Sequence, residues 1–212
     1  GQDTPLGPML LRLGNGIKGA GRYFDADMRY DFALGRAGRS VLTLDGVQMA
    51  ARSGANIRQN GALKLVQGRS GWELRSPLNL EVFGGDLPRS RIALSKTATG
   101  WQGDIGFDAY SAGGLDLSNA RILVSTAGAG RFSGNARYQG LDLRNVNLAS
   151  NSAGIGQFSG NARYSGPIPG GKIAGFVMPL DASFGGGGLR MAGGCQRVVF
   201  DRLVYSDYSF GP

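Results

Sequence analysis

Hydrophobic and polar residues alternate over most of this chain, and one stretch repeats the alternation in two tandem copies of a single unit. The copies span residues 114–139 and 140–165, and each opens with GLDL and closes with FSGNARY followed by one residue. Fifteen of the 26 aligned positions are identical, which is typical of a fold that stacks one supersecondary unit on the next. The unit is therefore the starting point for the whole sequence.

Within FSGNARY, apolar and polar residues occupy alternate positions. Phe132, Ala136 and Tyr138 alternate with Arg131 and Arg137, and successive side chains of a strand point to opposite faces of a sheet. The segment is therefore predicted to be a half-buried strand, with GLDL in its partner strand and TAGAGR or SAGIGQ as the turn. Because an isolated hairpin is marginally stable in water, successive units are expected to add strands to one common sheet.

Further alternating segments predict strands on both sides of the repeat. They span residues 22–34, 39–44, 47–52, 55–60, 63–67, 72–83, 91–95 and 101–109, followed by three β-rich segments after residue 171. The run WELRSPLNLEVF at 72–83 is predicted to be one long strand that Pro77 bends or places at a sheet edge. No helical period separates the strands, so the pattern excludes a parallel βαβ sheet and favours an antiparallel meander.

One stretch near the N-terminus has a helical period. Its apolar residues recur at spacings of three and four, at Leu6, Met9, Leu10, Leu13 and Ile17. This stripe predicts an amphipathic helix within residues 1–20, with Thr4 as N-cap and Pro5 in the first turn. Residues 14–19 also match GxGxxG, but they end a helix rather than follow a strand, so no dinucleotide site is expected.

Glycine is the outlier in the composition, with 38 residues. The glycines lie between and inside the alternating runs, where they mark turns, bulges and strongly curved strands. The sequence therefore predicts an all-β fold, in which residues 21–212 form one repeat-built antiparallel sheet curled into a groove. The helix of residues 1–20 is expected to cover one end or edge of this sheet.

The composition removes most catalytic chemistry. The chain has no histidine and one cysteine, Cys195, so disulfide frameworks, cysteine-rich zinc sites and mechanisms that need imidazole are excluded. Glu73 and Glu81 lie too far apart along a strand to act as a carboxylate pair. Asp25 and Asp27 lack the glycine and glutamate of a calcium loop and are assigned to the wet face of a strand. We expect no enzyme, cofactor or metal, and we expect Cys195 to be an inert apolar residue.

The net charge is +8, with 19 arginines and 4 lysines, and this excess favours anionic partners. The aromatic residues, however, share a face with aliphatic residues and the arginines lie opposite, which is unlike a nucleic-acid platform of aromatics and cations, so no nucleic-acid partner is expected. The sequence contains no apolar run long enough to span a membrane and no signal peptide, and its start predicts a piece excised from a longer protein.

The remaining question is what the apolar face contacts. Because it alternates Phe or Tyr with Gly and Ala, we expect channels between the rings that suit acyl chains, whose removal from water is favourable along their whole length. The residues predicted to line this lipid groove are Trp72, Leu74, Leu78, Leu80, Val82, Trp101, Ile105, Phe107, Phe132, Tyr138, Phe158 and Tyr164.

These features together resemble a known family. The helix TPLGPMLLRL, the long alternating strands, the tandem GLDL and FSGNARY hairpins and the closing GGCQRVVFDRLVY are similar to the C-terminal segment of an alphaproteobacterial YdbH-type protein. That family belongs with the AsmA-like and TamB-like proteins of the Gram-negative envelope. The resemblance implies a U-shaped groove, the β-taco, in a protein that a separate N-terminal membrane helix anchors in the inner membrane, and we expect this anchor to lie outside the given sequence. It further implies passage of phospholipid through the periplasm to the outer membrane, periplasmic or outer-membrane partner proteins, and no catalytic residue.

The residues alone leave an alternative open. The chain is then a structural β-solenoid or β-sandwich repeat module of an envelope or adhesin protein, and its apolar face is an ordinary core. The two hypotheses differ in one observable property, which is whether the folded chain leaves a long apolar trough open to solvent.

Overall fold

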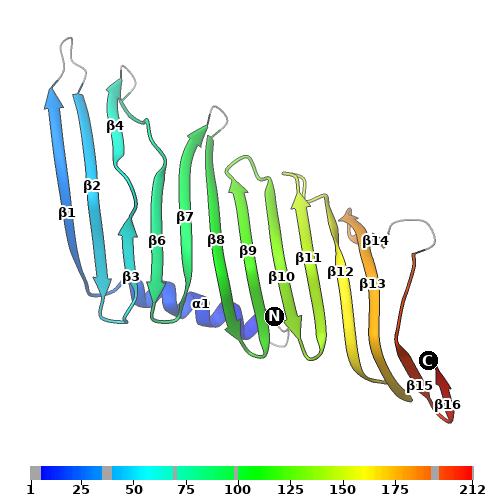
Figure 1. Cartoon of the computed structure of the whole chain (residues 1–212). Coiled ribbons are helices and arrows are strands. Elements are labelled where there is room, and N and C mark those ends of the chain that lie inside the picture. Colours follow the sequence, from blue (N-terminus) through cyan, green and yellow to red (C-terminus); the bar gives the residue numbers. More distant parts are fainter. Residues whose placement is uncertain (1–5, 35–39, 69–70, 98–99, 192–195, 212) are drawn as a thin grey trace.

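The computed structural model of the chain describes residues 6–34, 40–68, 71–97, 100–191 and 196–211. It contains one helix, α1 (Leu6–Ala20), and a single open antiparallel sheet of 16 strands (Figure 1). The predicted all-β fold with one short N-terminal helix is confirmed. The predicted cap residues Thr4 and Pro5, and Cys195, lie outside the described residues.

The strands follow one another along the chain in a meander. Their bounds are β1 (Phe24–Leu34), β2 (Ser40–Ala51), β3 (Asn56–Gln59), β4 (Leu63–Gly68), β5 (Gly71–Leu74), β6 (Leu78–Gly84), β7 (Leu87–Thr97), β8 (Gly100–Ala112), β9 (Leu115–Ser125), β10 (Gly130–Tyr138), β11 (Leu141–Ser150), β12 (Gly156–Ile168), β13 (Gly171–Gly185), β14 (Gly188–Met191), β15 (Arg202–Tyr205) and β16 (Tyr208–Phe210). From β6 to β13 each strand pairs with the next one in the sequence, and β1 pairs with β2 at the other end of the sheet.

The prediction of one long strand over residues 72–83 is wrong. The segment forms two strands with different partners, because β5 pairs with β4 and β6 pairs with β3. The break falls at residues 75–77, where Pro77 has no N–H to donate to a ladder. There the Ser76 hydroxyl accepts a hydrogen bond from the Lys64 N–H (2.8 Å) and donates one to the Ala62 carbonyl (3.0 Å).

Several long strands contain one residue with a left-handed backbone. Asn119 (φ 49°) and Asn145 (φ 52°) are the sixth residues of the two repeat copies, and Gly46 (φ 65°) and Gly175 (φ 63°) take this role in β2 and β13. The ladder register shifts beside each of them, as expected for a β-bulge. The bulge at Gly46 joins the two predicted strands 39–44 and 47–52 into the single strand β2.

The bulge residue Asn145 provides a test of this role. Replacement by valine is expected to lower the free energy of unfolding by about 1–2 kcal/mol, because a β-branched residue is disfavoured in the left-handed region. Asn145→Gly should keep the stability, since glycine adopts this conformation freely. Both variants retain the backbone N–H that donates to the Asn135 side chain (2.9 Å). Urea unfolding curves measure the difference, and equal stabilities of the two variants would contradict the assignment.

Helix α1 lies across one row of hairpin turns, at the lower ends of the strands in Figure 1. Gly19 lies beside Ser53 of the β2–β3 turn, and Pro8 lies beside Gly113 of the β8–β9 turn. A helix of 15 residues is about 22 Å long, and the five strand spacings from β2 to β9 amount to about 24 Å. The length of α1 therefore matches the part of the sheet that it crosses.

The side of α1 that packs on the sheet is narrower than the sequence predicts. Met9 is buried with Tyr110 and Leu115, and Leu13 packs against the same cluster. Gly16 is also buried. Leu10 and Ile17, which belong to the predicted apolar stripe, are instead 62% and 59% exposed, and the Leu6 side chain lies outside the described part. The contact with the sheet is therefore made by about one residue in each helical turn, namely Met9, Leu13 and Gly16.

Met9 and Leu10 are adjacent residues with opposite burial, so they form a matched pair. We expect Met9→Ala to lower the free energy of unfolding by about 2 kcal/mol, at the low end for a buried methionine because the cluster lies at a sheet end. Leu10→Ala should change it by less than about 0.5 kcal/mol. Denaturant unfolding, with hydrogen exchange of the α1 amides, distinguishes the two. A larger loss for Leu10→Ala would show that the helix packs through its other side.

Candidate functional site

One face of the sheet carries the large apolar side chains and contacts α1, and we call it the apolar face. Direct cross-strand partners form one row across it, from β6 to β13, which we call the central row. Its members are Leu80, Ile92, Ile105, Ile122, Phe132, Leu148, Phe158 and Ala182. Seven strand spacings make this row roughly 34 Å long. Neighbouring strands thus place apolar side chains side by side along an extended path.

The ladder register places all twelve residues predicted to line the groove on the apolar face. Trp72 belongs to this face at the β5 end, where its ring centroid lies 6.4 Å from that of Phe32. Glu73, Asp104 and Arg137 lie on the opposite face, since each is one residue out of phase with the apolar positions. The predicted alternation therefore has the correct phase in these strands. Lipid contact by the twelve residues stays a prediction.

Four members of the central row, Ile92, Ile122, Leu148 and Ala182, are not among the predicted groove residues. Ile122 and Leu148 occupy the ninth position of the two repeat copies, but the residue differs between the copies. Ile92 lies outside the repeat and is a direct partner of Ile105. Both copies have an aliphatic residue at this ninth position, and that shared property would have predicted Ile122 and Leu148 as members of the row.

Aromatic rings lie over glycines of neighbouring segments. A Cβ atom on Gly156 would collide with the Phe184 ring, and one on Gly170 would lie 3.0 Å from the Tyr205 ring. Packing of a ring over a glycine is a recognised way to stabilise sheets. At Gly156 the Phe184 ring fills the space above the glycine, so no channel lies there, whereas channels beside Gly134 and Gly160 in the repeat stay a prediction.

The apolar face is open to solvent. No large side chain among the described residues is fully buried, and the accessible surface is 14216 Å². A compact monomer of 22.2 kDa exposes about 9,400 Å², so this chain exposes roughly half as much again. Trp72 and Trp101, at 47% and 46% exposure, show that even indole rings on this face contact water. Soluble monomers rarely leave an extended apolar face open to water unless that face binds something.

The opposite face is polar and contains paired charges. Arg121 donates two hydrogen bonds to the Asp104 carboxylate, at 2.9 and 2.5 Å, and Arg89 binds Glu81 at 2.7 Å. Hydrogen bonding by Arg121 lowers the pKa of Asp104, and hydrogen bonding by Arg89 lowers that of Glu81. A depression of about 460 Å³ on this face is lined in part by Arg91, Asp104 and Arg121. Asp104 neutralises Arg121, so Arg91 alone supplies the net positive charge of this lining.

The lowered pKa of Asp104 predicts a pH dependence of stability. The folded pKa lies below the ordinary value of 3.8, so the pair stabilises the fold above that value and stops doing so as the pH falls through the folded pKa. Asp104→Asn should therefore lose less stability than the parent on acidification from about pH 5 to about pH 2. Thermal unfolding across this range measures the effect. Asp181→Asn, on the same face and without an ion pair among the described residues, should follow the parent.

Neither a metal site, a membrane-spanning helix nor a known relative provides evidence for the function. Within the described ranges no group of three or more His, Cys, Asp or Glu side chains could hold a metal ion. None of the helical structure described is long and apolar enough to cross a bilayer. Comparison of the chain with protein-family models, curated proteins and solved structures finds no match. The function is therefore inferred from the apolar face itself.

Proposed function

We propose that this chain is a lipid-binding segment of a bridge-like conduit that carries phospholipid between two membranes, with the acyl chains on the apolar face. The observation that carries the proposal is the central row across eight strands, which is partly open to solvent from Leu80 to Phe158 and buried only at Ala182. Each methylene kept from water contributes about 0.8 kcal/mol, so a 16-carbon chain gains on the order of 13 kcal/mol from a continuous apolar path.

The chemistry of the face favours hydrocarbon over peptide or carbohydrate. The side chains of the central row have no hydrogen-bonding group, and the ladders pair the backbone groups beneath them. A peptide or sugar laid on this face would lose hydrogen bonds to water without replacement, which costs free energy for each polar group. A hydrocarbon chain has no such groups to satisfy.

The repetition of the sheet favours sliding over one tight pocket. The repeat places Phe132 and Phe158 at equivalent positions 26 residues apart, so neighbouring units present equivalent apolar steps. A unique deep cavity would instead hold one ligand at one place. The resemblance to YdbH-type proteins agrees with this reading, and the same proposal places the chain in the periplasm, as part of an inner-membrane-anchored protein that delivers phospholipid to the outer membrane.

A charge placed in the central row tests the proposal. Phe132→Asp and Ile105→Asp should leave the fold largely intact, because neither side chain is fully buried, while lowering the bound phospholipid several-fold. A carboxylate in the row interrupts the apolar path and costs several kcal/mol when a chain covers it. Mass spectrometry of phospholipid extracted from the purified protein quantifies the bound lipid, and an assay of phospholipid transfer between vesicles measures passage along the row.

Ser133→Asp is the matched control, since Ser133 neighbours Phe132 on the polar face and the substitution should leave lipid binding unchanged. Parent protein without any bound or photo-crosslinked phospholipid, together with unfolding of Phe132→Asp, would overturn the proposal. That result would assign the apolar face to a core completed by another protein layer, as in a structural repeat module.

A further inference from the structure

Helix α1 carries apolar side chains that the sheet does not use. Leu10 and Leu11 are each 62% exposed and Ile17 is 59% exposed, whereas Met9 on the sheet side is buried. The helix contains Arg12 and Lys18 and no acidic residue. These three exposed side chains do not all point the same way, and their directions follow from the contacts of the rest of the helix.

The contacts fix two directions around the helix axis. Met9 and Leu13 point to the sheet, while Pro8 and Gly19 lie against the hairpin turns. At about 100° per residue these two directions lie roughly 110° apart.

Leu10 and Ile17 lie on the side opposite the turns. They therefore point along the strands and over the apolar face. Leu11 and Lys18 lie on the side opposite the sheet and point to solvent.

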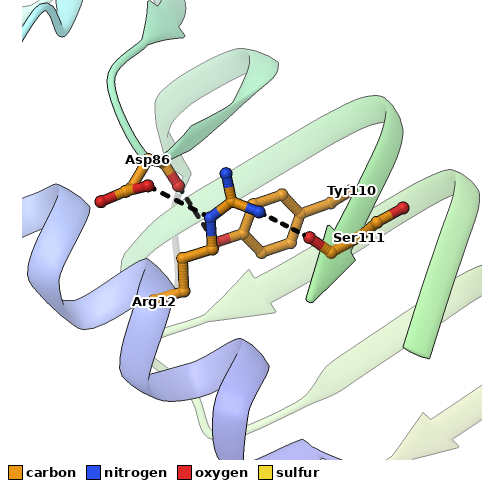
Figure 2. Close-up of polar contacts among 4 residues, drawn as sticks. All are labelled: Arg12, Asp86, Tyr110 and Ser111. Atoms are coloured by element: carbon orange, nitrogen blue, oxygen red, sulfur yellow. Dashed lines mark hydrogen bonds and ion pairs between the residues drawn. The ribbon is translucent and has the colours of Figure 1, made fainter. Parts of the chain in front are cut away.

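A polar cluster holds the helix in this orientation (Figure 2). Arg12 donates from Nε to the Asp86 carboxylate (3.2 Å) and from Nη1 to the Ser111 carbonyl (2.7 Å). Its guanidinium also lies 5.7 Å from the centre of the Tyr110 ring, and the Tyr110 hydroxyl donates to the Asp86 carbonyl (3.0 Å). Arg12 thus joins the β6–β7 turn to the end of β8 and prevents the helix from rolling. This cluster and the buried Met9 together set the direction of Leu10 and Ile17.

We infer that α1 forms a side wall of the acyl-chain site, with Leu10 and Ile17 contacting the hydrocarbon that lies on the strands beside them. The strands next to the wall carry Val82, Phe107 and Ile105, so the floor and the wall are both apolar. The inference rests on the proposed function, because it names a second lining of the same site.

The charge of α1 fits a phospholipid. Lys18 lies on the outer side of the wall, next in sequence to Ile17, and Arg22 follows the helix. No carboxylate of α1 opposes them. A hydrocarbon chain against Ile17 therefore has cations within reach of its phosphate group, which is the complement that an anionic amphiphile requires.

Photo-crosslinking tests the wall with a matched pair. A benzophenone amino acid is placed at Leu10, at Leu11 or at Ile105, and each purified protein is incubated with vesicles of radiolabelled phosphatidylglycerol and phosphatidylethanolamine. Leu10 and Leu11 have the same exposure but different directions, so accidental contact with vesicles labels them equally. The wall predicts strong labelling at Leu10 and Ile105, and at least five-fold weaker labelling at Leu11.

The other outcomes separate the two proposals. Labelling at Ile105 with equal or no labelling at Leu10 and Leu11 would overturn the wall and leave the lipid site in place. No labelling at any of the three positions would overturn the proposed function itself. As a second measurement, Leu10→Asp should lower the co-purified phospholipid at least two-fold while Leu11→Asp leaves it unchanged, with both variants folded because both side chains are exposed.

Discussion

The structure depends on keeping apolar side chains on one face of strands that are ten or more residues long. Strict alternation does this only while the strand is regular, and the ladders of β2, β9, β11 and β13 are interrupted. The left-handed residues Asn119, Asn145, Gly46 and Gly175 absorb the irregularity. Each inserts one residue, so that apolar positions on its two sides are three apart instead of two and still share a face. Without the bulge at Asn119, Leu115 and Leu117 would lie on the polar face, away from Met9 of α1.

Much of this arrangement is readable in the sequence. The tandem copies predict the hairpins, the alternation predicts the common face, and the glycine content predicts curvature. The break at residues 75–77 was not predicted, because Trp72, Leu74, Leu78 and Leu80 continue one alternation across Pro77, and only the partner strands show that the chain changes neighbours there. Local pattern carries no information on which strand lies alongside.

The candidate site was predictable to a similar degree. The phase of the twelve groove residues is visible in the alternation, whereas the filling of the space over Gly156 by Phe184 depends on a contact between strands. The orientation of α1 was mispredicted for a related reason. Leu10 and Ile17 fit a helical stripe as well as Met9 does, and the choice between them is made by Arg12 and the turn residues that it reaches.

Helix α1 crosses the hairpin turns only from β2 to β9, and among the described residues no other segment crosses the turns that follow. The two halves of the sheet therefore differ in stiffness. In the first half, α1 packs across the strands and stiffens the sheet. The strands from β10 onward are joined to their neighbours only through ladders and side-chain contacts within the sheet. Bending about an axis parallel to the strands should concentrate in that second half, so its curvature can adapt while the braced half keeps its shape.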